Sequence, residues 1–308
     1  MSQLTSQKPE TCPACKKKST ERMNEMTGTL GYIPLTQKSF LFFCRNCNLF
    51  FRWPYLSPEE LEQHYSEIGT EEWKDDYRID QKKISKLIKR RLSSGNVLDV
   101  GCFRGEFLNE LPGNFIKYGI EPSLAARDIA HGHGIKLIGS TLDSIDTESV
   151  PTFDVITAID LIEHVQNPLD ALQQLANLLK AGGYLIVSTG NTDAFTWRLL
   201  RENYWYYFTE HVSFTNPKWF RWACEKLCLT VEATHKFAYY KGSFYLKLRQ
   251  LAMAVGYRAW QFASQHGLLT KTVSRVWPFN RIQTWTTSPV ARMWPDHMII
   301  VLRKKLRL

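Results

Sequence analysis

The sequence predicts an α/β fold in which a doubly wound, mostly parallel sheet follows a small metal-binding module. Three observations support this prediction. A strand, a Gly-bearing turn and a helix follow one another over residues 96–111, the order that opens the ligand site of such sheets. Apolar strands then alternate with helical segments, and two C-x-x-C pairs lie near the N-terminus.

Composition indicates a globular protein with an anionic partner. With 308 residues, 44% of them hydrophobic, the chain can bury one large core and one small one. Its net charge of +9 favours nucleic acid, a phosphorylated substrate or an acidic membrane surface. The first ten residues are polar, unlike a signal peptide, and no apolar run is long enough to cross a bilayer, so we expect a cytoplasmic protein.

The four N-terminal cysteines form two knuckle-like pairs, Cys12 with Cys15 and Cys44 with Cys47. Four thiolates at this spacing can surround a tetrahedral Zn²⁺, which would be structural because no ligand position stays open. Redox disulfides or four buried thiols are the alternatives. We expect a zinc ribbon over residues 1–56, followed by a helical linker over residues 57–95.

The turn after the first strand of the sheet is the first candidate ligand site. It reads D-x-G-x-x-x-G from Asp99 through Gly101 to Gly105, which fits neither a P-loop nor a G-x-G-x-x-G dinucleotide fingerprint. The next strand, residues 115–121, ends in Glu121, about 20 residues beyond the turn, where an acid can accept both hydroxyls of a ribose. Together these residues predict a nucleoside site.

Further strands are expected at residues 135–138, 153–160, 184–188, 230–240 and 296–302. A helix should begin at Pro168 and end before Gly182 and Gly183. The strand ending at Asp160 is apolar, as in a buried parallel sheet.

The D-x-G turn, the FDVITAIDLIEHV run and the GGYLIVSTGN run together resemble class I S-adenosylmethionine-dependent methyltransferases. Phe103 stands where that family's usual D-x-G-x-G-x-G motif has its middle Gly. The resemblance implies a Rossmann-like seven-stranded sheet, with its core at 96–240 and its last strand within 296–308, and S-adenosylmethionine as cofactor. The implied cofactor-binding residues are Asp99, Gly101, Cys102, Gly105, Glu121, Pro122, Ser140 and Asp160.

The aromatic segment 204–214 follows the fifth strand and carries Glu210 and His211. It is similar to an E-H-x-x-F stretch of sugar and small-molecule methyltransferases, some of which also carry a four-cysteine module. Methyl transfer to a hydroxyl or acidic carbon needs a proton acceptor, and a neutral imidazole serves near pH 7. We therefore expect the base to be His211 or His164, with His211 on the acceptor side.

Residues 241–295 form a predicted helical, Trp-rich insertion whose apolar face could pack on the sheet, form a dimer or contact a membrane surface. The leading functional hypothesis is methylation of a small acceptor, specifically a nucleotide-linked sugar. The alternatives are an RNA methyltransferase that grips phosphates with the ribbon and the basic residues 82–91, and a non-catalytic cofactor-binding scaffold.

Overall fold

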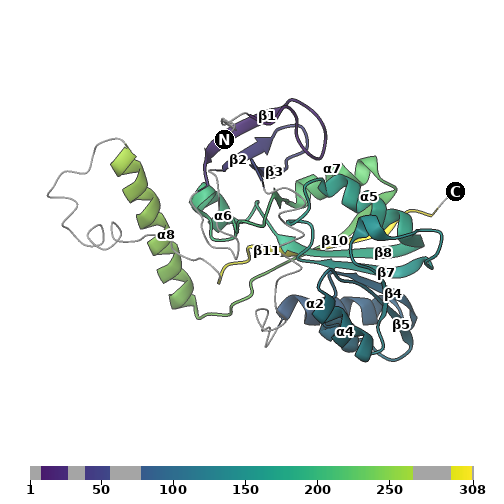
Figure 1. The fold of residues 1–308 in the computed structure, drawn as a ribbon. Coiled ribbons are helices and arrows are strands. Elements are labelled where there is room, and N and C mark those ends of the chain that lie inside the picture. Colours follow the sequence, from purple (N-terminus) through teal and green to yellow (C-terminus); the bar gives the residue numbers. More distant parts are fainter. Residues whose placement is uncertain (1–7, 27–38, 56–77, 266–292, 307–308) are drawn as a thin grey trace.

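The computed structural model describes residues 8–26, 39–55, 78–265 and 293–306 (Figure 1). Within these residues, a seven-stranded sheet has the order β10-β11-β8-β7-β4-β5-β6. The strands are β4 (Gly95–Val100), β5 (Phe115–Ile120), β6 (Lys136–Gly139), β7 (Phe153–Ile159), β8 (Leu179–Gly190), β10 (Leu229–Phe237) and β11 (His297–Lys304). Within this sheet, β11 runs antiparallel to β8 and β10, and the other strand pairs are parallel. The predicted α/β sheet is therefore confirmed.

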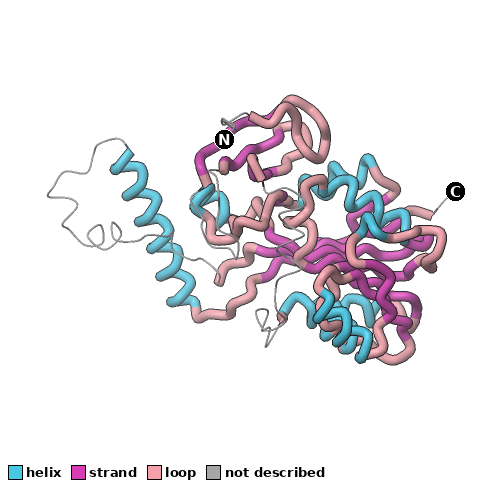
Figure 2. The backbone as a smooth tube through the Cα atoms, in the orientation of Figure 1, coloured by secondary structure: helices cyan, strands magenta, loops and turns pink. Residues whose placement is uncertain are grey.

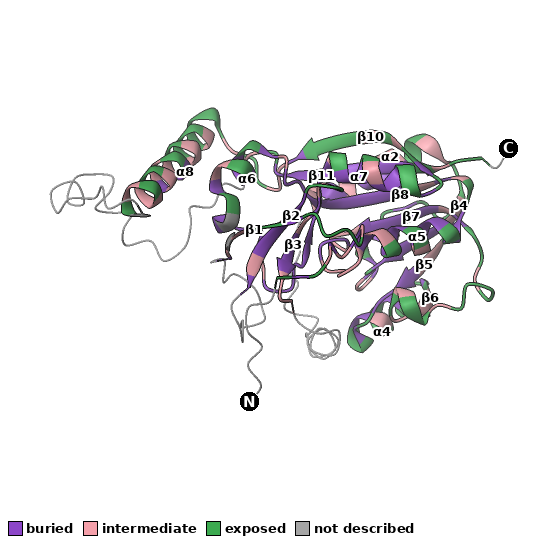
Figure 3. Cartoon of the chain, turned by 90° about the horizontal axis from the view of Figure 1, so that it is seen from above, coloured by how far each residue is buried: buried purple, intermediate pink, exposed green. Residues whose placement is uncertain are grey.

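Helices cover both faces of this sheet (Figure 2). Ile84 and Ile88 of α2 pack on one face, and Leu172 of α5 and Trp219 of α7 pack on the other. In Figure 3 the central strands are buried, while β10 at the edge is largely exposed. The helices are α2 (Ile79–Arg91), α3 (Glu106–Asn109), α4 (Leu124–Gly132), α5 (Pro168–Leu178), α6 (Phe195–Leu200), α7 (Pro217–Lys226) and α8 (Phe244–Gln265), with short 3₁₀ turns η1 (Leu142–Ser144) and η2 (Arg201–Asn203).

One boundary differs from the sequence prediction. Gly182 and Gly183 were expected to separate α5 from the fifth strand, but β8 begins at Leu179 and contains both. Leu179 pairs with Phe153, and the register then shifts before Val155 meets Tyr184. Gly182 has φ +77°, so the glycines form an irregularity within the strand.

The N-terminal module shares its sheet with the core. Among the described residues, β1 (Thr20–Glu25), β2 (Phe40–Cys44) and β3 (Phe50–Trp53) continue into β9 (Ser213–Phe214), which comes from the aromatic segment. Phe50 lies opposite Phe214, and Phe51 lies opposite Ser213. The predicted ribbon is therefore joined to the core through backbone pairing.

Arg52 completes this junction from β3. Its side chain is 1% exposed and donates to the backbone oxygens of His211 (3.0 Å), Tyr207 (3.1 Å) and Phe208 (2.8 Å), and to Ser39 Oγ (2.5 Å). Burial lowers the pKa of Arg52 to about 10, which still leaves it charged at neutral pH. One guanidinium thus ties the module to the turn before His211.

The predicted insertion contains α8, whose expected apolar face is largely open. Phe244 is 74% exposed, Val255 48% and Phe262 59%, whereas Ala254 and Tyr257 are buried near α6. The apolar face of α8 therefore does not pack on the sheet. Residues 57–77 of the expected helical linker and residues 266–292 of the insertion lie outside the described residues. None of the helices that the structure describes is long and apolar enough to span a membrane.

Replacing Arg52 by Met should lower the free energy of unfolding by about 3 kcal/mol or more, because buried carbonyl oxygens lose their donor. Arg45→Met is the matched control, since Arg45 and Glu21 pair with 72% and 52% of their side chains exposed. That change should cost less than about 1 kcal/mol. Urea unfolding of both variants measures the difference, and equal losses would contradict the bracing role of Arg52.

Candidate functional site

The turn between β4 and α3 has the backbone shape of a ligand-binding loop. Gly101 and Gly105 have φ +78° and +81°, and a Cβ on Gly105 would lie 1.9 Å from Ile135 Cδ1. Phe103, in the place of the expected middle Gly, also adopts a left-handed φ of 49°. The loop therefore keeps its shape despite the side chain at this position.

Glu121 is anchored to this turn. Its carboxylate accepts hydrogen bonds from the backbone N–H groups of Phe103 (2.8 Å) and Ser123 (2.9 Å), and the residue is 5% exposed. Burial raises the pKa of Glu121, and the two N–H donors counteract part of that rise. An acid fixed in this way has lone pairs left for the hydroxyls of a ribose.

Asp99 and Cys102 lie beneath the turn. Thr157 Oγ1 donates to Asp99 Oδ1 over 2.6 Å, yet burial raises the pKa of Asp99 to about 7. The Cys102 side chain is buried against β5, where a Cβ on Gly119 would lie 2.5 Å from its Sγ. Burial also raises the pKa of the Cys102 thiol, so this side chain is a poor nucleophile.

The outer residues of the predicted cofactor site lie along the same strand ends. Pro122 follows Glu121 and is exposed, and Ser140 follows β6. The backbone N–H of Ser140 donates to Ser144 Oγ (3.2 Å) in the η1 turn. Asp160, at the end of β7, has a left-handed φ of 50° and begins the loop that carries His164.

Arg78, Asp80 and Tyr239 meet Asp160 in a cluster that the sequence analysis missed. Arg78 lies 2.8 Å from Asp80 and 2.5 Å from Asp160, and the Tyr239 hydroxyl donates to Asp80 (2.9 Å). Burial alone would raise the pKa of Asp80, but the charge and hydrogen bond of Arg78 outweigh burial and lower that pKa. For Asp160, burial outweighs the charge of Arg78 and raises the pKa. These residues come from three distant segments, so no local motif could reveal them.

Glu163, the acid of the E-H-V run, was also missed in the sequence analysis. It is fully buried and accepts hydrogen bonds from Tyr206 Oη and from Thr189 Oγ1 (2.9 Å). Burial, with the charge of Asp160, raises the pKa of Glu163 to about 7. The sequence feature that could have identified Glu163 is its place next to His164 in the E-H-V run.

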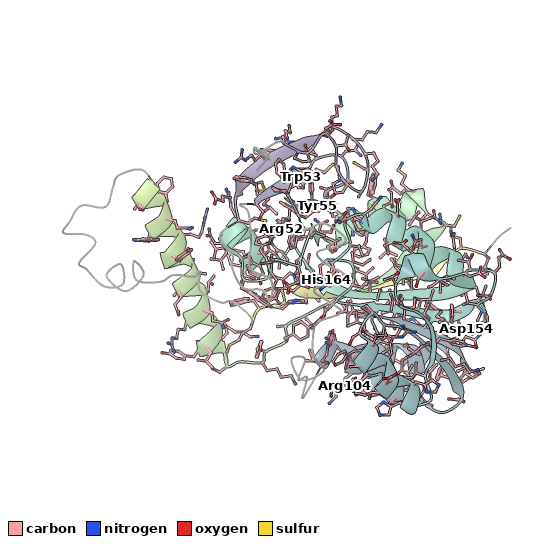
Figure 4. The ribbon with its side chains drawn as sticks, in the orientation of Figure 1. Arg52, Trp53, Tyr55, Arg104, Asp154 and His164 are labelled. Atoms are coloured by element: carbon pink, nitrogen blue, oxygen red, sulfur yellow. The ribbon has the colours of Figure 1, made fainter. Side chains whose placement is uncertain are left out.

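His164 and His211 are brought together, as the sequence placed them, at the carboxyl edge of the sheet. Their ring centres are 4.7 Å apart, and His211 Nδ1 donates to the Tyr206 carbonyl (2.9 Å). Burial lowers the pKa of His164 to about 4 and that of His211 well below its ordinary value. Figure 4 shows His164 near Arg52 at the junction with the ribbon, away from Asp154 at the opposite strand end.

The aromatic segment itself is mostly structural. Tyr204 and Tyr207 are 0% and 1% exposed and pack around Trp197, whose indole N–H donates to the Tyr207 hydroxyl (2.6 Å). Glu210 is also buried, and burial raises its pKa. The rings therefore fill the core between the two sheets.

The four N-terminal cysteines converge. Their sulfur atoms lie within 4.8 Å of one another, with Cys12 to Cys47 at 3.6 Å and Cys15 to Cys44 at 3.5 Å. Four sulfurs around Zn²⁺ are about 3.8 Å apart, given Zn–S bonds of about 2.3 Å. The donor set and its spacing fit a tetrahedral metal.

Comparisons with known proteins agree with this fold. A family model described as a methyltransferase domain matches residues 71–234, which is more than half of the chain. A chain in the Haloferax volcanii complex of the Trm112 methyltransferase activator with a methyltransferase superposes with a TM-score of 0.50 at 12% identity, covering 80% of this chain and 98% of that one. This likeness supports the fold.

Curated relatives include ubiquinone biosynthesis O-methyltransferases. The protein from Vibrio parahaemolyticus is 29% identical over 44% of this chain and 64% of its own length. The one from Cronobacter sakazakii is 31% identical over 41% of this chain and 56% of its own length. The chain thus spans between half and two thirds of these relatives. From the sheet order, the D-x-G turn and the family match together, we conclude that this chain belongs to the methyltransferase-domain family.

Proposed function

We propose that the protein transfers a methyl group from S-adenosylmethionine to a small-molecule acceptor. The observation that carries the proposal is the anchored Glu121 facing the left-handed turn at Gly101–Gly105. When bound, the cofactor supplies an electrophilic methyl group on a positively charged sulfur. Glu121 would hold its ribose, and Arg78 would pair with its carboxylate.

Charge at the strand ends supports a cationic ligand. Asp99 and Glu163 are buried and Asp160 is half-buried, all three have raised pKa values, and the Arg78 guanidinium pairs with Asp160. A ligand with sulfonium and ammonium groups would offset this negative charge, which favours the cofactor over a neutral nucleoside.

The acceptor side is proposed to lie at the segment carrying His164 and His211. The curated relatives are named as O-methyltransferases, which supports a hydroxyl acceptor. A nucleotide-linked sugar remains the specific candidate because the net charge of +9 suits phosphates. An RNA acceptor has less support from the basic helix α2. There Lys89 donates to the Glu110 carbonyl and Arg91 pairs with Glu232, so both side chains already have partners within the protein.

We also propose that the four-cysteine cluster holds a structural Zn²⁺. The support is the convergence of four sulfurs at tetrahedral spacing in a module that packs Phe42 and Phe51 around the cluster. Through β3 and Arg52, the metal would hold the segment that carries His211.

Transfer of label from methyl-labelled S-adenosylmethionine into nucleotide-sugar, quinone-precursor phenol and RNA pools tests the function. Glu121→Gln should weaken cofactor binding by about tenfold or more, because an amide cannot accept from both N–H groups as the charged carboxylate does. Glu106→Gln, at an exposed acid beside the turn, is the control and should bind normally.

Label in a small-molecule pool supports the proposal. Label confined to RNA would show that the acceptor is RNA and would contradict a small-molecule acceptor. Unchanged cofactor affinity in Glu121→Gln would contradict the assigned site. Calorimetry supplies the affinities, and circular dichroism confirms that both variants fold.

For the metal, elemental analysis of the purified protein should find one zinc per chain, and Cys47→Ser should lose most of it and unfold at a lower temperature. Cys224→Ser is the control, because Cys224 is a buried thiol on α7, outside the cluster. Equal zinc content in the two variants would rule out the cluster as the metal site.

A further inference from the structure

Asp296 and His297 form a buried pair at the start of β11. His297 Nδ1 donates to Asp296 Oδ1 over 2.8 Å, and the two side chains are 0% and 1% exposed. Asp296 Oδ2 also accepts hydrogen bonds from the Tyr204 hydroxyl and from Trp205 Nε1 (3.2 Å). Because the Nδ1 proton faces a carboxylate, the neutral ring carries its lone pair on Nε2.

The other ring nitrogen, His297 Nε2, is buried and has no hydrogen-bond partner in the part of the chain that the structure describes. Leaving a buried polar atom unpaired costs about 1–3 kcal/mol. Since buried polar groups in proteins are otherwise paired, such an atom calls for an explanation. A ligand group that arrives during the reaction would supply the missing partner.

The topology puts this atom at the candidate site. β11 runs antiparallel to β8, and His297 lies opposite Gly190, the last residue of β8. The strand therefore starts at the edge where the parallel strands end. The Tyr239 ring is 4.7 Å from the His297 ring, and its hydroxyl is 3.5 Å from either carboxylate oxygen of Asp160. One tyrosine separates the imidazole from the Arg78–Asp160 pair.

The electrostatics distinguish His297 from the two histidines expected from sequence. Burial alone would lower the pKa of His297, but the hydrogen bond and charge of Asp296, with Asp160 and Glu163, outweigh it and raise that pKa. Burial lowers the pKa of His164 and of His211, which makes both weaker bases. The titratable or charged groups around His297 are Asp296, Asp160, Glu163, Tyr206, Tyr239 and His211.

We propose that His297, oriented by Asp296, accepts the proton of the acceptor's hydroxyl group during methyl transfer. This inference rests on the proposed function. The O–H bond breaks and its proton moves to Nε2, forming an imidazolium. The oxygen forms a bond to the methyl carbon, and the electron pair of the carbon–sulfur bond stays on sulfur. Asp296 then faces a cation, as the carboxylate does in a Ser-His-Asp triad.

His297→Asn tests the proposal, because an asparagine can still donate to Asp296 but cannot accept the proton as imidazole does. We expect kcat to fall by about 10²- to 10⁴-fold, with cofactor affinity by calorimetry unchanged. His235→Asn, on the exposed edge strand β10, is the control and should keep its activity.

Asp296→Asn provides a second, independent variant with a spectroscopic readout. Removing the carboxylate should lower the pKa of His297, which ¹⁵N NMR of the imidazole measures. The acidic limb of the plot of kcat against pH should move to lower pH by the same amount. A purely structural pair would reduce the yield of folded protein without moving that limb.

The proposal is overturned if His297→Asn keeps its kcat and pH profile, or if NMR places the proton of the neutral ring on Nε2. Wild-type protein that methylates no acceptor would instead overturn the proposed function, and the inference with it. If the wild type and the His297→Asn variant are equally active, the role of His297 is contradicted while the proposed function stands.

Discussion

The site depends on negative charge that the fold removes from water at one edge of the sheet. Asp99, Glu121, Asp160 and Glu163 all follow or end parallel strands, and burial raises the pKa of each. Hydroxyls, backbone N–H groups and Arg78 stabilise these carboxylates in part. Such an edge is well suited to a ligand that brings positive charge. The chemistry proposed for the site follows from that imbalance.

The second constraint is the segment between the two sheets. It is fixed on one side by Arg52 and the β3–β9 pairing, and on the other by Val212, whose N–H donates to the Glu163 carbonyl (2.7 Å). The N-terminal module thus acts on the site through position, by holding the loop that carries His211.

The sheet, the cysteine cluster, Asp99 and Glu121 were predictable because each is encoded by short spacings: an apolar run, a C-x-x-C pair, an acid after a strand. Arg78, Tyr239 and His297 were not, since their proximity arises only when segments more than 50 residues apart meet at one edge. β9 was missed because a two-residue strand has no periodicity. The early start of β8 came from pairing with β7, which overrode the local preference of two glycines.

The most direct measurement of the central claim compares the affinities of S-adenosylmethionine and its neutral product, S-adenosylhomocysteine, by calorimetry between about pH 6 and about pH 8. Asp99 and Glu163, whose pKa values lie at about 7, lose protons over this range. Ionised carboxylates attract the sulfonium ligand and not the thioether, so its relative affinity should rise with pH and the rise should shrink in Asp99→Asn. A ratio of affinities that stays constant with pH would contradict a site organised around buried negative charge.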